Sequence, residues 1–143
     1  MGGMGDDRYY RPALARIHHE GFGFHADACA PGILALLDDV RRRDGLVVEV
    51  GCGTGLLTKH LTDAGHRVIA TDASPAMLDL ASEYAPDAVE HQVLALPDDP
   101  VPECDAVVST GHALSYLPDQ ATLEAALVAC ARALRPGGVL ALD

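Results

Sequence analysis

The sequence predicts an α/β fold in which one parallel sheet is covered by helices on both faces. Short runs rich in Val, Leu and Ile alternate, from residue 46 to the end of the chain, with segments that carry apolar residues at helical spacing. Such alternation implies right-handed crossovers between parallel strands. The length of 143 residues allows about one domain. We therefore expect a three-layer α/β domain over residues 45–143, preceded by a helical segment over residues 1–44.

The N-terminal segment is expected to contain two helices. Residues Asp7–His19 have helical character, and Gly21 and Gly23 are expected to interrupt the helix, because glycine disfavours a helix interior. The second helix is expected to begin within residues 26–31, since apolar side chains recur at helical spacing over Ile33–Val40.

The first half of the sheet domain is expected to alternate strand and helix. A β-branched run bounded by glycines predicts a buried strand at Leu46–Val50, and a helix over Leu56–Ala64 follows it and ends at a glycine. A second strand is expected at His66–Thr71. The pair Ser74–Pro75 then supplies an N-cap and a first helical residue for a helix that runs to about residue 84.

The second half of the domain continues the pattern. A weaker third strand is expected at Ala88–Val93 and a Val-rich fourth strand at Cys104–Ser109. Asp119 is expected to cap a long helix that runs through Leu123, Leu127, Cys130 and Leu134. The run Pro136–Gly138 then turns the chain into a fifth strand at Val139–Leu142.

The composition argues against several classes of partner. Ten Lys and Arg stand against 21 Asp and Glu, and the resulting net charge of −11 repels phosphate backbones and anionic membrane surfaces. No apolar run approaches the roughly 20 residues that a membrane-spanning helix needs. The four cysteines form no CxxC pair, and the N-terminus does not resemble a secretory signal. We expect a cytoplasmic protein with reduced thiols that binds neither nucleic acid nor membranes.

Two features at the ends of the first two strands predict a nucleotide-type ligand site. Residues 49–55 read E-V-G-C-G-T-G and join a strand to a helix, and their alternating glycines let the backbone turn tightly beside a ligand. Leu56 stands where the dinucleotide fingerprint, counted from Gly51, needs its third glycine. Asp72, at the end of the second strand, is placed to accept both hydroxyl groups of a ribose.

With these motifs in this order, the sequence resembles the class I S-adenosylmethionine-dependent methyltransferases. The resemblance covers residues 46–143 and is carried by the loop at 49–55 and by Ala70–Ser74, Asp105–Ser109 and Leu134–Gly138. It implies a Rossmann-like sheet of strand order 3-2-1-4-5. Because the family sheet has seven strands, we expect its last strands to be absent from this chain. We also expect the uncovered fifth strand either to associate with a second copy or to be accompanied by further residues.

The resemblance also implies the cofactor and the residues that hold it. The cofactor would be S-adenosyl-L-methionine, which leaves as S-adenosyl-L-homocysteine. The glycine loop would hold its methionyl part, Asp72 its ribose, and Ala73 and Met77 its adenine. The expected cofactor-binding residues are Glu49, Gly51, Cys52, Gly53, Gly55, Asp72, Ala73, Met77, Leu94, Ala95 and Thr110. The acidic residue that many members carry after the third strand, to bind the adenine amino group, has no counterpart at Val93 or Leu94.

The methyl acceptor is expected to be a small molecule. No Asn-Pro-Pro-Tyr segment, typical of enzymes that methylate bases or glutamine, follows the fourth strand. His112, which follows that strand, and His19, in a segment that often covers the cofactor in this family, are the candidate catalytic bases. The histidines at 18, 19 and 25 match no common zinc spacing, so no metal is expected, and a surface or packing role is an alternative for them.

The sequence leaves two other functions to be tested. One is a non-catalytic module that binds an adenosyl cofactor or takes part in an assembly. The other, less favoured because of Leu56, is an NAD-dependent oxidoreductase.

Overall fold

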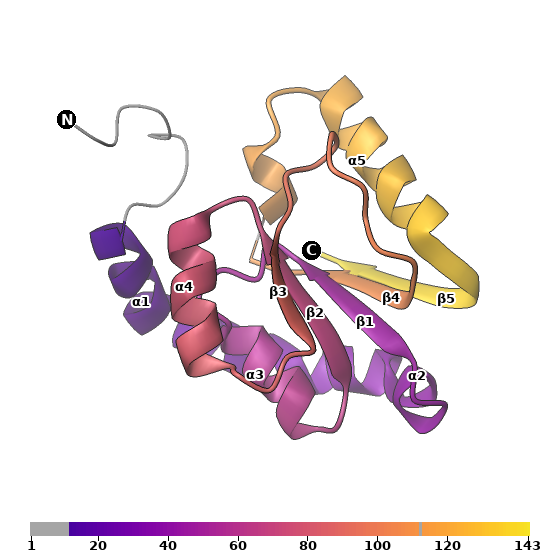
Figure 1. Ribbon diagram of the computed structural model, residues 1–143, viewed down its shortest axis with the longest axis horizontal. Helices are drawn as coiled ribbons and strands as arrows, with labels where there is room; N and C mark the ends of the chain where they lie inside the picture. The colour runs from indigo at the N-terminus through magenta and orange to yellow at the C-terminus, as the bar shows by residue number, and fades with distance from the viewer. Residues whose placement is uncertain (1–11, 112) are drawn as a thin grey trace.

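The computed structural model describes residues 12–111 and 113–143, in which helices and strands alternate as expected (Figure 1). No helix in these two ranges is long and apolar enough to cross a membrane. The helices are α1 (Pro12–Leu36), α2 (Asp38–Arg42), α3 (Leu56–Asp63), α4 (Pro75–Tyr84), the 3-10 helix η1 (Ala113–Tyr116) and α5 (Gln120–Ala133). The strands are β1 (Leu46–Val50), β2 (Arg67–Asp72), β3 (Glu90–Val93), β4 (Cys104–Ser109) and β5 (Leu134–Leu142).

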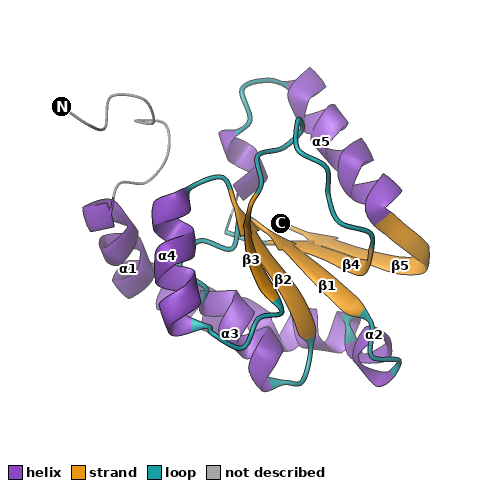
Figure 2. Cartoon of the chain, viewed as in Figure 1, coloured by secondary structure: helices purple, strands orange, loops and turns teal. Residues whose placement is uncertain are grey.

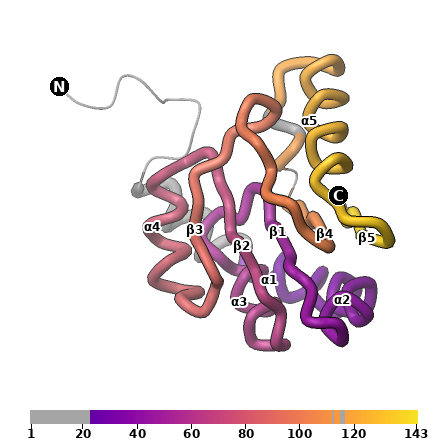
Figure 3. Tube along the Cα trace, turned by 45° about the vertical axis from the view of Figure 1, so that its right-hand side comes forward, coloured from indigo at the N-terminus to yellow at the C-terminus, as the bar shows by residue number. Residues whose placement is uncertain are grey.

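The five strands form one parallel sheet in the predicted order β3-β2-β1-β4-β5 (Figure 3). Val48, at the centre of β1, pairs with Ile69 of β2 on one side and with Val107 of β4 on the other. The strand order reverses between β1 and β4, and the carboxyl ends of these two strands therefore flank the crevice in which ligands of such sheets bind. The predicted three-layer fold class is confirmed.

The two faces of the sheet are covered by different helices. Figure 2 shows the helices in purple and the strands of the sheet in orange. On one face, alternate strand residues such as Val47 and Val68 pack against α1, α2 and α3. On the other face, Val48 and Val107 pack against the Cys130 side of α5. This alternation arises because successive side chains of a strand point to opposite faces.

Helix α1 corrects the expected break at Gly21 and Gly23, because it continues through both glycines as far as Leu36, and the second helix of this segment, α2, begins only after Leu37. Ala26, Ala30 and Ile33 are buried, and they recur at helical spacing. Their burial offsets the roughly 1 kcal/mol that each glycine costs a helix. The helical conformation at Gly21 and Gly23 is therefore determined by tertiary packing, which a local sequence pattern does not show. The first residues of the predicted helix, 7–11, lie outside the described residues.

The last strand also differs from its prediction. β5 follows α5 directly, beginning at Leu134, where a helical residue and then a turn were expected. Leu134 pairs with Cys104, and the next paired residue, Val139, lies opposite Ala106. The Pro-Gly-Gly run is thus an irregularity within the strand, which shifts the register between two paired stretches. The remaining boundaries agree with prediction to within about two residues.

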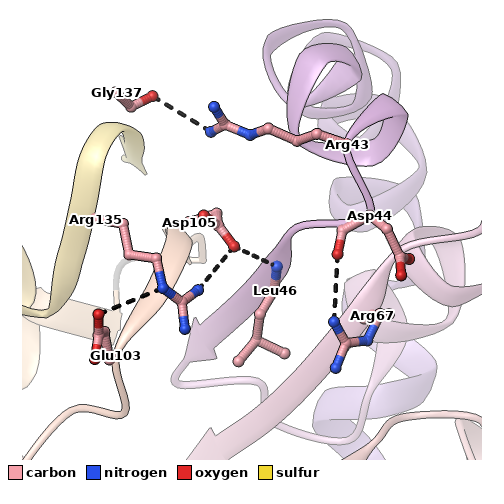
Figure 4. A network of polar contacts seen from close by, with 8 residues as sticks. All are labelled: Arg43, Asp44, Leu46, Arg67, Glu103, Asp105, Arg135 and Gly137. Carbon is pink, nitrogen blue, oxygen red and sulfur yellow. Dashed lines mark hydrogen bonds and ion pairs between the residues drawn. The ribbon is translucent and has the colours of Figure 1, made fainter.

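A polar network ties the amino ends of β1, β4 and β5 together (Figure 4). The carboxylate of Asp105 accepts a hydrogen bond from the Leu46 backbone N–H at 2.8 Å and one from the Arg135 guanidinium at 2.9 Å. The Leu46 hydrogen bond, helped by Arg135 and Arg43, holds the pKa of Asp105 below its usual range. Arg135 also pairs with Glu103 at 3.4 Å. The network lies at the edge of the sheet opposite the carboxyl ends of the strands.

Candidate active site

A cavity of about 810 Å³ opens at the carboxyl ends of the central strands. The residues after β1, β2 and β4 form its floor, η1 and the start of α5 form one wall, and α1 reaches its edge through His25 and Ala26. A cavity at this topological switch point is where an open α/β sheet binds its ligand. The cavity is large enough for a ligand of nucleoside size.

Ten of the eleven predicted cofactor-binding residues line this cavity. The ten are Glu49, Gly51, Cys52, Gly53, Asp72, Ala73, Met77, Leu94, Ala95 and Thr110. Gly55 is not among the lining residues, and it begins α3 with a φ of +90°. A Cβ there would lie 3.2 Å from the Cα of Ala81, so this glycine lets α3 approach α4.

The glycine loop is held by hydrogen bonds within the protein. The N–H of Cys52 donates to the Thr71 carbonyl at 2.8 Å, and that of Gly53 donates to Oδ2 of Asp72 at 2.9 Å. The N–H of Gly55 donates to the Cys52 carbonyl at 3.1 Å. A dinucleotide-binding loop offers its N–H groups to a pyrophosphate, whereas these three already have partners. The loop geometry therefore disfavours a diphosphate ligand at this position.

Gly51 brings the loop into close contact with η1. Its φ is +69°, a conformation that side chains other than glycine rarely adopt. A Cβ at this position would lie only 2.4 Å from the Cβ of Ala113. The residue is therefore fixed as glycine both by its backbone conformation and by the wall of the cavity.

Asp72 connects the ends of β1 and β2. Its Oδ1 accepts from the Ser74 N–H at 2.8 Å, and its Oδ2 accepts from the Gly53 N–H. The two backbone bonds fix the direction in which the carboxylate faces. This arrangement suits the predicted contact with a ribose.

Glu49 is the second acidic group of the cavity, and it is only 2% exposed. Burial raises the pKa of Glu49 to about 8, and the nearby Asp72 carboxylate adds to the increase. The hydroxyl of Thr58 donates to Oε1 of Glu49 at 2.5 Å and opposes the increase. A positively charged ligand group beside Glu49 would favour its ionised form.

The lining suits S-adenosylmethionine, which combines two cationic groups, a ribose and a flat aromatic base. The ionisable acids Glu49, Asp72 and Asp98 line the cavity, whereas its described lining includes no Lys or Arg. Met77 and Leu94 supply apolar walls for a base. The hydroxyl of Ser109, which lies 4.0 Å from the position of a Cβ at Gly51, is 2% exposed and has no hydrogen-bond partner among the described residues. Acidic and apolar walls fit a cationic nucleoside better than a dinucleotide.

The adenine-side segment differs in detail from the sequence expectation. The N–H of Leu94 donates to the Asp72 carbonyl at 3.0 Å, and that of Ala95 donates to Oδ2 of Asp99 at 2.7 Å. An adenine edge would have to share these donors. Asp98 lines the cavity in the same segment. It lies four residues after Leu94, where the sequence has no acidic residue to bind the adenine amino group.

The two candidate bases, His112 and the side chain of His19, lie outside the described residues. Cys52 lines the cavity, but burial raises its pKa well above the usual value, which does not suit a nucleophile.

Several lining residues were missed by the sequence analysis. His25 was considered only within a histidine cluster, because its place at the cavity depends on how α1 packs. The others lie in segments that had no motif, namely Leu96, Pro97, Asp98, Leu114, Leu117, Pro118 and Thr122.

Comparison with known proteins identifies the class to which this fold and site belong. Residues 47–138 match the methyltransferase domain family. The chain therefore belongs to this family, and the predicted relationship to the class I S-adenosylmethionine-dependent methyltransferases is confirmed.

Individual relatives agree with this assignment. The chain is 35% identical to the cypemycin N-terminal methyltransferase of a Streptomyces species over 78% of its own length and 47% of that protein. Its fold matches the sugar N-methyltransferase KedS8 of Streptoalloteichus sp. ATCC 53650 with a TM-score of 0.77 at 28% identity, over 100% of this chain and 59% of that one. It also matches S-adenosylmethionine-bound CalS10, an amino pentose methyltransferase of Micromonospora echinaspora, with a TM-score of 0.69 at 29% identity, over 94% and 56%. The chain thus spans about half the length of these relatives.

Proposed function

We propose that this chain binds S-adenosylmethionine in the cavity at the carboxyl ends of β1, β2 and β4 and serves in methyl transfer to a small-molecule acceptor. The observation that carries the proposal is the pairing of the loop at 49–55 with Asp72 in a cavity whose ionisable side chains are mainly acidic. Family membership and a solved relative with S-adenosylmethionine bound support it.

Each part of the cofactor has a partner of suitable chemistry. Asp72 would accept the ribose hydroxyls, and Met77 would pack against the adenine. Glu49 and the hydroxyl of Ser109 lie on the β1–β4 side, where they suit the amino group of the methionyl part. Bound S-adenosylmethionine supplies an electrophilic methyl group, which the acceptor atom attacks as the carbon–sulfur bond breaks and its electron pair stays on sulfur. The protein positions the acceptor and excludes water.

An amine is the acceptor that we propose to test first. The three relatives described above are named for methylation at an N-terminus, a sugar nitrogen and an amino pentose. The acidic lining of the cavity favours a neutral or cationic acceptor over an anionic one.

Calorimetric titration tests the cofactor assignment. S-adenosylmethionine and S-adenosylhomocysteine should bind and raise the melting temperature of the chain, because both would bind the native state alone. NAD should produce no saturable heat, since the loop N–H groups are already paired. Stronger binding of NAD than of S-adenosylhomocysteine would reverse the assignment.

An acceptor panel then tests the transfer itself. The panel contains a 3-amino-3-deoxyhexose, an amino pentose, a peptide with a free N-terminus and the hydroxyl analogue of each sugar. We expect methylation of an amine and not of its matched hydroxyl analogue. Cofactor binding without turnover on any member would instead favour the non-catalytic binding module.

A further inference from the structure

Glu49 is the one acid of the described cavity lining that is buried, whereas Asp72 is half-buried and Asp98 is exposed. Two fully buried hydroxyl groups hold it in place. The hydroxyl of Thr71, in β2, donates to the backbone carbonyl of Glu49 at 2.8 Å. The hydroxyl of Thr58, in α3, donates to its Oε1 at 2.5 Å. The position of the carboxyl group is therefore fixed by neutral partners.

The charged surroundings of Glu49 are mostly acidic or neutral. The titratable groups that share the cavity with Glu49, or whose charge is coupled to it, are Asp72, Asp98, Cys52, Cys29 and His25. Burial also raises the pKa of the Cys52 and Cys29 thiols, so both are neutral near pH 7. His25, whose Nε2 atom lies 3.4 Å from Oδ2 of Asp143, is the member of this set that can become cationic. No permanent positive charge faces Glu49 within the described lining.

We propose that binding of S-adenosylmethionine is coupled to proton release: Glu49 is neutral in the ligand-free protein and ionises when the ammonium group of the methionyl part lies beside it. This inference rests on the proposed function. A buried carboxyl group without a cationic partner keeps its proton, because its charged form would lose its hydration. The ammonium group supplies the missing charge. The carboxyl O–H bond then breaks, its electron pair stays on oxygen, and the proton passes to solvent while the ligand keeps its own protons.

Thr58 is the positioning residue for this exchange. Its hydroxyl opposes the increase in the pKa of Glu49, because a donated hydrogen bond favours the ionised carboxylate. The side chain is fully buried, and Thr58 is not among the lining residues, so it acts on a ligand only through Glu49. Loss of the hydroxyl should raise the pKa of Glu49 further. Tight binding should then begin at a higher pH.

Calorimetry in two buffers with different heats of ionisation counts the protons that binding releases. S-adenosylhomocysteine, which has the same amino acid part as S-adenosylmethionine, is the main ligand. 5′-Methylthioadenosine keeps the adenosine and the sulfur but lacks the amino acid part, so it is the reference ligand. The full 143-residue chain is compared with its Glu49→Gln, Thr58→Val and Thr58→Ser variants. Asp105→Asn is the matched control, because Asp105 is a carboxylate with a lowered pKa at the opposite edge of the sheet.

The expected result follows from the folded-state pKa of Glu49, which is about 8. At pH 7 about nine in ten molecules then carry the proton, so S-adenosylhomocysteine should release about 0.9 proton. Its affinity should rise about tenfold from pH 6 to pH 7 and level off above the pKa of Glu49. 5′-Methylthioadenosine should release no proton and show no such rise.

The variants assign the released proton to a residue. Glu49→Gln should abolish the release and the rise in affinity with pH, whereas Asp105→Asn should keep both. Thr58→Val should move the levelling of affinity to a higher pH, and Thr58→Ser, which restores a hydroxyl, should return it towards the wild-type position.

Two outcomes overturn the inference. One is binding of S-adenosylhomocysteine to the wild type without proton release. The other is a release that persists in Glu49→Gln, which would assign the proton to another group such as His25. An unchanged pH profile in Thr58→Val would overturn the role of Thr58. Failure of the wild type to bind S-adenosylmethionine and S-adenosylhomocysteine would instead overturn the proposed function. A variant that does not fold is recognised by its circular dichroism, and the comparison of the two ligands on the wild type then decides the question.

Discussion

Replacement of Gly51 by alanine should destabilise the protein, because the new methyl group would overlap with Ala113 of η1 in the wall of the cavity. The added methyl group would lie 2.4 Å from the Cβ of Ala113, about 1 Å short of the roughly 3.5 Å at which carbon atoms normally touch. Overpacking of this kind costs about 1–3 kcal/mol. The positive φ of +69° adds about 1–2 kcal/mol for a residue other than glycine. We therefore expect a loss of about 2–5 kcal/mol in the free energy of unfolding.

The chain contains a control that separates these two contributions. Gly111 has a φ of +70°, almost the same as Gly51, but a Cβ there would meet no atom within 4 Å. Gly111→Ala should therefore cost only the backbone contribution of about 1–2 kcal/mol. In a Gly51→Ala background, Ala113→Gly removes the atom that the new methyl group meets. It should recover most of the packing contribution, although the new glycine has a backbone cost of its own.

Urea denaturation of the four chains without ligand, followed by titration with S-adenosylhomocysteine, measures both effects. Gly51→Ala should also weaken the ligand, because Ala113 lines the cavity and must move. Equal losses of stability in Gly51→Ala and Gly111→Ala would refute the packing argument. So would the absence of any recovery on adding Ala113→Gly to Gly51→Ala.

Three further predictions concern carboxylates. Asp72→Ala should weaken S-adenosylhomocysteine by about 1.5–3 kcal/mol in calorimetry while the chain still folds, and unchanged affinity would show that Asp72 does not bind the ribose. Glu49 has a folded-state pKa of about 8 against 4.5 for a free glutamate, so the ligand-free protein should lose stability as the pH rises from 4.5 through 8. Glu49→Gln should remove that dependence. If the free energy of unfolding, measured by urea denaturation at a series of pH values, changes with pH in the same way in the wild type and the variant, the prediction is wrong. Asp105 has a lowered pKa, so its contribution should be complete above the unfolded-state value of 3.8 and be lost as the pH falls through the folded value. Asp105→Asn should therefore cost about 1–2 kcal/mol near neutral pH and almost nothing at strongly acidic pH, and a gap that persists in acid would indicate a packing effect.

The strands and helices of the sheet domain could be predicted from sequence because the signals for them are local, whereas the strand order followed from the family resemblance. A strand such as Leu46–Val50 is bounded by glycines, and the Ser74–Pro75 cap marks a helix start that the structure reproduces, with Ser74 accepting from the Met77 N–H. Helix α1 could not be predicted in the same way. Gly21 and Gly23 indicate a break, and only the burial of residues such as Ala30 against the sheet overrides that preference. β5 was misjudged for a similar reason, because the Pro-Gly-Gly run is accommodated by a register shift against β4.

The lining that comes from the ends of β1 and β2 was more predictable than the lining that comes from α1. Gly51 and Asp72 belong to a compact motif whose spacing in the sequence follows directly from one strand–loop–helix–strand unit. His25 reaches the cavity from a helix 24 residues before Glu49, and its partner Asp143 follows the last strand. Such a pair has no spacing rule, because its geometry depends on how α1 crosses the sheet. The sequence therefore placed His25 only within a histidine cluster and gave no reason to expect it at the cavity.

The continuity of α1 constrains how the cavity can change. The same helix buries Ala30 and Ile33 in the main core and, one to two turns earlier, presents His25 and Ala26 to the cavity. A rigid rod anchored in this way cannot be moved outward to widen the cavity without exposing apolar core to water, at a cost of about 25 cal/mol for every Å². In chains with this architecture we therefore expect this edge of the cavity to vary through the side chains at positions 25 and 26, while the path of the helix stays the same.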